Sequence, residues 1–223
     1  MAESQAIRNS SRTIEPRESP FGVGLFDCRM DDNPAKLLFT DEHKALRAQR
    51  QLSDGHEFYR PRKPSPFALI CHIEFPQAEE RPVLEGPLFV PKHEDDAWFI
   101  YHYQGELMFL HWLDADCSYR AHIVRKRDRI IVEYVNYFAT GLVNSAAYHL
   151  GVVDYLIKAY LYNKFVPHPM PACAVPSDPE SICTLSFFYF GRRGLFATSE
   201  DTIHLPWLDV DVRSLLSRKP RPL

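Results

Sequence analysis

Four side chains that could take part in chemistry lie within seven residues of one another. His111, Asp114, Asp116 and Cys117 offer an imidazole, two carboxylates and a thiol. Such groups can bind a metal ion, and a thiol beside a histidine can act as a nucleophile. A zinc site normally draws its ligands from two segments at a defined spacing, and nothing in the sequence gives Cys117 an electropositive setting. We therefore predict no metal and no cofactor, and keep His111, Asp114 and Cys117 as the catalytic candidates.

Aromatic side chains surround this cluster. Tyrosine and tryptophan combine an apolar ring with a polar tip, which suits both partner surfaces and ligand pockets. The candidate residues for ligand or partner binding are Trp98, His111, Trp112, Tyr119, Asn136 and Tyr137. The same aromatic residues could instead border an aromatic core, and the pattern leaves both interpretations open.

Four strand-like runs must position these residues. They cover residues 97–103, 106–113, 117–124 and 129–138, and short polar turns separate them. Parallel strands would need crossovers of about a dozen residues or more, so the runs predict an antiparallel meander. Strand alternation then places Trp98 and His111 on one face, with Tyr119 close to His111 and His122 beside Met108.

A helix follows the meander. Asn144 or Ser145 can cap its N-terminus, and apolar residues then recur at spacings of three and four until prolines end the pattern near Val166. We expect Asp154 on this helix to pair with Arg120 or a neighbouring tyrosine. The fold class is thus α+β, an antiparallel meander sheet of five or more strands packed on one main helix at about 145–166, with short peripheral helices.

The remaining segments predict smaller elements. We expect a surface helix from Thr40 to about Leu52. Further strand-like runs cover residues 21–26, 67–75, 84–90, 183–190 and 195–198. The expected organisation is a flexible N-terminal segment at 1–20, a single domain at 21–218 and a tail at 219–223.

Composition excludes several classes of function. A net charge of −3 gives no overall field for nucleic acid, and the basic turn at residues 125–129 is expected to be solvated. Five cysteines without a C-x-x-C pair indicate reduced thiols and a cytoplasmic protein. No apolar run reaches the length of about 18 residues that a membrane span requires. We predict neither a nucleic-acid nor a membrane partner.

The central stretch resembles a group of uncharacterised bacterial proteins. The matching residues are W-F-I-Y at 98–101, L-M-F at 107–109, C-S-Y at 117–119 and V-N at 135–136. That group carries a W-F-I-Y strand, an L-Y-F-x-R-S-W-T-G-x-x-x-Y strand pair and a V-N-R-D element, and some members are associated with ADP-ribosylglycohydrolase-type domains. This chain departs from the pattern at residues 111–115 (H-W-L-D-A), where R-S-W-T-G would fall, and at Tyr137, where the group has arginine.

Three functions remain open from the sequence. The first is a small cytosolic binding protein, an inhibitor, immunity or accessory factor, that uses an aromatic-rich surface on a protein partner. The second, implied by the resemblance, is an enzyme acting on a nucleotide or an ADP-ribose-type ligand. The third is a homo-oligomeric structural protein. A cleft that gathers His111, Asp114, Tyr119 and Asn136 would favour the enzyme, and a flat exposed patch would favour the binding protein.

Overall fold

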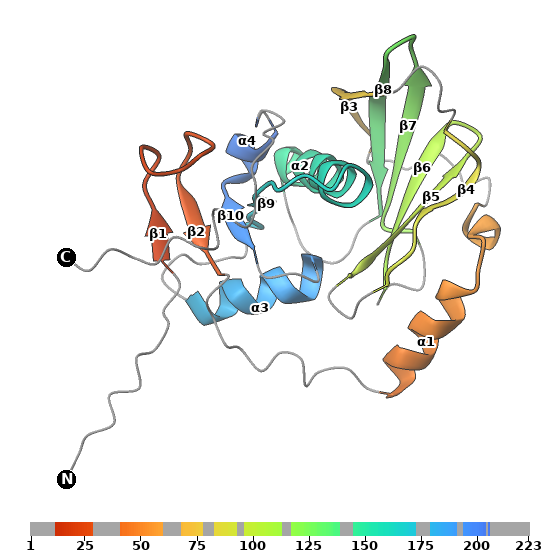
Figure 1. Ribbon diagram of the computed structural model, residues 1–223, viewed down its shortest axis with the longest axis horizontal. Coiled ribbons are helices and arrows are strands. Elements are labelled where there is room, and N and C mark those ends of the chain that lie inside the picture. The colour runs from red at the N-terminus through yellow and green to blue at the C-terminus, as the bar shows by residue number, and fades with distance from the viewer. Residues whose placement is uncertain are drawn as a thin grey trace.

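A six-stranded antiparallel sheet dominates the computed structural model (Figure 1). The structure describes residues 12–28, 41–59, 68–77, 83–92, 96–112, 117–138, 145–172, 179–190, 194–203 and 205. Four consecutive strands form the predicted meander: β5 (Trp98–Tyr103), β6 (Glu106–His111), β7 (Tyr119–Arg125) and β8 (Arg129–Tyr137). The α+β fold class and the meander are both confirmed.

Two further strands extend the sheet at its edges. The strand β4 (Gly86–Phe89) pairs with β5, and β3 (Ala68–Pro76) pairs with β8, so the order is β3-β8-β7-β6-β5-β4. The runs at 67–75 and 84–90 are therefore strands, as predicted. A bulge interrupts the pairing of β3 and β8 between Ile70 and Ile73.

The register fixes which side chains share a face. Trp98 lies opposite His111, and Tyr119 lies opposite Phe109 on the other side of β6, so the predicted grouping of Trp98, His111 and Tyr119 is confirmed. Tyr119 also pairs with Tyr137, whereas Arg120 pairs with Asn136. Since successive strand residues point to opposite faces, Tyr137 and Asn136 lie on opposite sides of the sheet.

The predicted main helix covers one face, which we call the helix face. It begins as α2 (Ala146–Leu156), continues as one π-helical turn η3 (Ile157–Leu161), and the Ser145 hydroxyl accepts a hydrogen bond from the Tyr148 N–H at 3.2 Å. The helix ends at Leu161 and is thus shorter than predicted. It is buried on most sides because a second layer packs against it: a Cβ at Gly151 would lie 2.8 Å from Thr202 Oγ1 and 3.2 Å from Pro169 Cβ.

The second layer is a small sheet. Its order is β1 (Arg12–Ile14), β2 (Leu25–Asp27), β10 (Leu195–Ala197) and β9 (His168–Pro169), and the helix α4 (Ser199–Thr202) follows β10. It includes the predicted strand at 195–198 and the end of the run at 21–26. β1 lies inside the segment 1–20, for which we expected loose or peripheral packing.

The predicted strand at 183–190 is wrong, because these residues belong to the helix α3 (Pro179–Phe190). A short apolar run does not distinguish a buried strand from a buried helix by periodicity alone. The segment begins with Pro179 and Glu180, and proline at a first helical position followed by an acidic residue is typical of a helix N-terminus.

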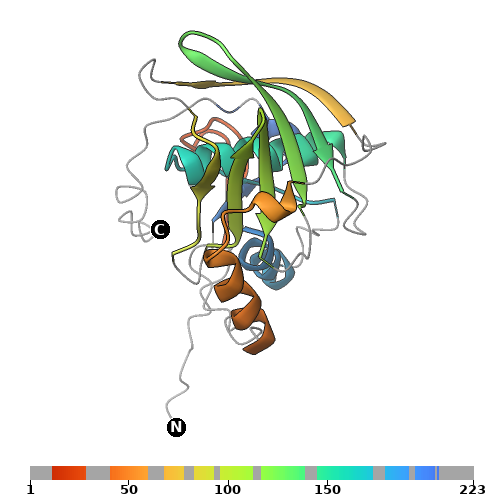
Figure 2. The ribbon, with the colours of Figure 1, turned by 90° about the vertical axis from the view of Figure 1, so that its right-hand side faces the viewer.

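A helix and a 3-10 turn cover part of the opposite face, which we call the outer face. The helix α1 (Asp41–Gln51) confirms the prediction near 40–52, although Thr40 lies outside the described residues, and η2 (His56–Phe58) follows it. Arg120 on the outer face donates to the Phe58 carbonyl at 2.8 Å. Figure 2 shows η2 in front of the central strands and α1 at their lower ends, both away from β3 at the sheet edge.

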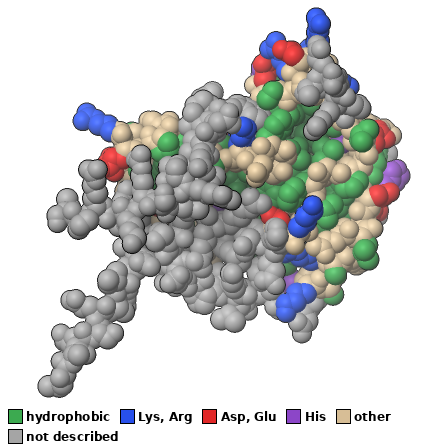
Figure 3. All heavy atoms as spheres, viewed as in Figure 1, with side chains coloured by type: hydrophobic (Ala, Val, Ile, Leu, Met, Phe, Trp, Pro, Cys, Tyr) green, Lys and Arg blue, Asp and Glu red, His purple; other side chains and the backbone are tan. Residues whose placement is uncertain are grey.

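Charged side chains gather at the tip of the β7–β8 hairpin, at the top of Figure 3. Arg125 through Arg129 are all exposed, in agreement with the predicted solvated turn. In the described ranges, no helix is long and apolar enough to cross a membrane.

Candidate functional site

Three of the predicted site residues lie in the buried aromatic layer of the helix face. The ring centroids of Trp98 and His111 are 5.0 Å apart, and those of Trp98 and Tyr119 are 6.0 Å apart. All three side chains are buried. They therefore belong to the aromatic core, the second of the two interpretations that the sequence left open.

Polar atoms of this layer hold the C-terminus of α3. The last carbonyls of an α-helix have no partner within the helix. Here His111 Nε2 lies 2.9 Å from the Phe188 carbonyl, Trp98 Nε1 donates to the Tyr189 carbonyl at 2.7 Å, and the Tyr160 hydroxyl donates to the Phe190 carbonyl at 2.8 Å. A carbonyl can only accept, so Nε2 of His111 carries the proton. His111 thus serves to fix a helix end.

A second group joins β7 and β8 to the start of α2. The Tyr119 hydroxyl and His149 Nδ1 are 3.1 Å apart, and the rings of Tyr137 and His149 stack with centroids at 3.9 Å and planes at 14°. Burial lowers the pKa of His149 from 6.5 to about 4, because desolvation disfavours the imidazolium. A neutral, enclosed histidine with a tyrosine partner is typical of a structural core.

Cys117 and Trp112 also have structural environments. The Cys117 thiol is buried and donates to the Tyr119 carbonyl at 2.8 Å. Trp112 is buried against His43 of α1, with centroids at 5.4 Å and an edge-on angle of 89°. Asp114 lies outside the described residues. Within the parts of the chain that are described, no group of three His, Cys, Asp or Glu side chains could hold a metal ion.

Arg120, one of the two expected partners of Asp154, is not its partner. Asp154 Oδ2 of α2 pairs with Lys158 Nζ of the following turn η3 at 2.6 Å, and Lys158 also donates to the Leu205 carbonyl at 3.1 Å. Arg120 lies on the outer face, where its Nη1 is 3.6 Å from Glu106. The two residues are therefore separated by the sheet, which the sequence could not reveal without the register.

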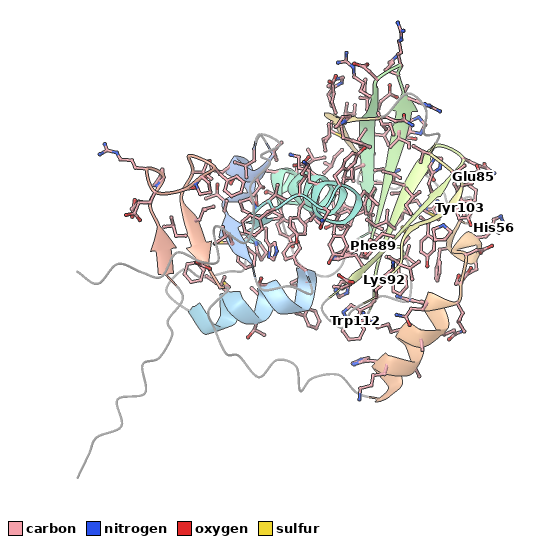
Figure 4. All side chains as sticks on the ribbon, in the orientation of Figure 1. His56, Glu85, Phe89, Lys92, Tyr103 and Trp112 are labelled. Carbon is pink, nitrogen blue, oxygen red and sulfur yellow. The ribbon has the colours of Figure 1, made fainter. Side chains whose placement is uncertain are left out.

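A tyrosine cluster at the β5–β6 turn is a feature that the sequence did not single out. The Tyr103 hydroxyl donates to the Asp54 carbonyl at 2.8 Å, and its ring meets His56 edge-on at 5.5 Å. Burial, and to a smaller extent the carboxylate of Asp54, raise the pKa of Tyr103. Figure 4 shows Tyr103, His56 and Glu85 side by side, away from Trp112. These contacts attach η2 to the outer face.

The β3 side of the outer face carries an exposed aliphatic side chain. Ile70 of β3 is 91% exposed and lies opposite Tyr134 of β8, and Tyr134 in turn lies opposite His122 of β7. The rings of His122 and Tyr134 stack with centroids at 4.9 Å and planes at 10°. Ala68 and Asn136 form the next pair on the same face of the two strands. We call Ala68, Ile70, His122, Tyr134 and Asn136 the outer patch.

The outer patch contains one of the predicted binding residues, and the sheet lies between this residue and two of the others. Asn136 lies there, whereas His111 and Tyr119 face α2 and α3. The run A-L-I-C-H-I-E-F at 68–75 alternates regularly, and it places Ile70 on the exposed side with His72 and Glu74, so this alternation was the signal that could have identified the exposed isoleucine.

Comparisons of the chain with known proteins found no match. No protein family, no curated protein and no solved structure matches it. The resemblance to bacterial proteins with a W-F-I-Y strand therefore stays a prediction.

Proposed function

We propose that this chain is a non-catalytic cytosolic protein, an inhibitor, immunity or accessory factor, that binds a protein partner through the outer patch. One observation carries the proposal: Ile70, a large aliphatic side chain on a sheet face, is 91% exposed. An apolar group on a sheet face is normally covered by another layer. Of the described elements on this side, η2 lies over the central strands and α1 at their ends, both away from β3.

The composition of the outer patch suits a protein partner. The stacked pair of His122 and Tyr134 gives a rigid aromatic surface with polar tips, and Asn136 adds donors and acceptors beside it. Aromatic anchors of this kind contribute much of the binding energy at protein interfaces. The exposed carboxylate of Glu133 lies 4.0 Å from Nε2 of His122 and gives the outer patch a polar border.

The cytosolic location has its own support. Cys28, Cys71 and Cys117 take part in no disulfide within the described part of the chain. Burial raises the pKa of Cys71 to about 11, which keeps its thiol protonated and slow to oxidise. Free thiols are typical of a reducing compartment.

The experiment is photocrosslinking in the native cell. A photoreactive benzoylphenylalanine replaces Tyr134 in the outer patch, and a matched control carries it at Leu52, which is 92% exposed at the end of α1. We expect an adduct with one other protein from position 134 and none from position 52. Equal adducts from both positions, or no adduct from position 134, would overturn the proposal.

The nucleotide-enzyme alternative has a separate test. It requires His111, Asp114, Tyr119 and Asn136 to converge, yet the sheet stands between Asn136 and the two core residues His111 and Tyr119. A rise in Tm of the purified chain with ADP-ribose at about 1 mM would favour the enzyme over the binding protein.

A further inference from the structure

Among the described strands, β3 pairs with β8 alone and is the outermost of the six. Near one end of β3, the Tyr162 hydroxyl donates to the Pro76 carbonyl at 2.6 Å. At its end, the Gln77 N–H donates to the Asp128 carbonyl at 3.0 Å. Backbone groups of a strand alternate in direction, so those of Phe75 and Ile73 also point toward β8, and those of Glu74 point to the free edge. An unpaired edge of this kind is a template for another strand.

The sequence of β3 is complementary to itself about Ile73. In an antiparallel copy with Ile73 opposite Ile73, His72 of each strand lies opposite Glu74 of the other. A histidine facing a glutamate across a strand pair can share a hydrogen bond with it, and the two form an ion pair when the imidazole is protonated, whereas two facing glutamates repel each other. Within one chain, His72 Nε2 and Glu74 Oε1 already lie 2.7 Å apart, and their side chains are 66% and 41% exposed. Glu74 Oε2 also accepts a hydrogen bond from Arg129 Nη1 at 3.0 Å, so a contact across the edge would use Glu74 Oε1, the oxygen that now faces His72 of the same chain.

The two ends of β3 limit the pairing to a short stretch. The bulge between Ile70 and Ile73 interrupts the regular ladder on one side, and Pro76 has no N–H on the other. In the register centred on Ile73, the exposed Ile70 faces Pro76 of the copy, so each partner covers an apolar side chain of the other. Pairing of identical edges about a two-fold axis is closed and does not propagate.

We propose that two copies of this chain pair through antiparallel β3 strands, with Ile73 on the two-fold axis and His72 opposite Glu74, and so join two sheets into one. The proposal does not rest on the outer-patch function, because it concerns the strand edge and needs only purified protein.

Sedimentation velocity tests the association. We expect the weight-average mass to rise from 25.9 kDa toward twice that value as concentration increases. The substitution His72→Glu places a glutamate opposite Glu74 of the other copy at both positions of the pair. It should weaken the dimer at least about tenfold. The exchange His72→Glu with Glu74→His restores opposite partners and should recover association. Leu52→Glu adds the same charge away from β3 and should leave the mass unchanged.

A disulfide test fixes the register. Because the backbone of Ile73 points toward β8, the two Ile73 residues would form a non-hydrogen-bonded pair with Cα atoms about 4.5 Å apart, which suits a disulfide. In a Cys71→Ser background, Ile73→Cys should form a covalent dimer under mild oxidation, and Leu52→Cys should not. A monomer at every concentration, or His72→Glu and the exchange variant both associating like the unchanged chain, would overturn the proposal.

Discussion

The Tyr119 hydroxyl and His149 Nδ1 lie 3.1 Å apart in the core, and this hydrogen bond joins the central sheet to the first turns of α2. It lies where the sequence favoured a functional site, yet its surroundings are those of packing. The Tyr137 ring covers one side of His149, and Tyr148 meets it edge-on at 5.5 Å. The hydrogen bond between Tyr119 and His149 therefore helps to attach α2 to the sheet.

Removal of the Tyr119 hydroxyl should destabilise the fold. Tyr119→Phe leaves a buried ring nitrogen of His149 without its partner, which costs about 1–3 kcal/mol in free energy of unfolding. The matched control is Tyr59→Phe, which removes an exposed hydroxyl bonded to Gln104 at 2.8 Å and should cost less than about 0.5 kcal/mol. Urea denaturation measures both. Equal losses would show that the Tyr119 bond is exposed to water.

The free energy of unfolding should decrease as the pH is lowered, because His149 must then take up a proton. Its pKa in the folded chain is about 4, below the ordinary 6.5, so the unfolded chain binds the proton more readily. The stabilisation is complete above about pH 6.5 and decreases as the pH falls toward 4. His149→Gln removes the titrating group and should lower the pH dependence in this window. Urea midpoints at several pH values check it, and identical profiles for both proteins would contradict it.

Breaking the buried ion pair between Asp154 of α2 and Lys158 of η3 should destabilise the fold strongly, whereas replacing both residues by apolar ones should destabilise it little. Lys158→Met leaves the Asp154 carboxylate buried without its partner and should cost about 3–5 kcal/mol. The double variant Asp154→Leu with Lys158→Met removes both charges and should recover most of that loss. A double-mutant cycle by urea denaturation measures the coupling. Additive losses would contradict a direct interaction.

Gly151 should resist substitution although it lies inside a helix. Alanine normally stabilises a helix interior by about 1 kcal/mol relative to glycine. Here the added Cβ would lie 2.8 Å from Thr202 Oγ1 and 3.2 Å from Pro169 Cβ, so α2 and the small sheet must separate. Gly151→Ala should therefore destabilise the chain by about 1–3 kcal/mol. Thermal unfolding checks the sign, and the control Gly151→Ala with Thr202→Ala should recover part of the loss. A higher Tm for Gly151→Ala alone would contradict the contact.

The meander was predictable because its turns are short. Runs separated by polar turns of a few residues allow only antiparallel neighbours, and alternation then placed Trp98 opposite His111. The cap at Ser145 was predictable for a similar reason, since it depends on one local hydrogen bond.

The errors arose where distant segments decide the outcome. The apolar run at 183–190 carries no period that separates strand from helix, and its contacts with Trp98 and His111 form only in the fold. For the aromatic residues the sequence left surface and core both open, because residue type alone does not reveal a covering layer, which α3 supplies for Trp98 and His111. Alternation along β3 does place Ile70 on the exposed side with His72 and Glu74, but only the strand pairing shows that Tyr134 and His122 lie beside it.

The rate at which a maleimide labels a cysteine at position 134 in the native cell tests the central claim most directly. Tyr134→Cys, in a Cys71→Ser background, places a reactive thiol in the outer patch, and Leu52→Cys in the same background is the control. The account predicts that a permeant maleimide labels position 134 rapidly in the purified chain and several times more slowly in native cells, while position 52 reacts equally in both. Equal labelling rates at position 134 in both settings would contradict a partner on the outer patch.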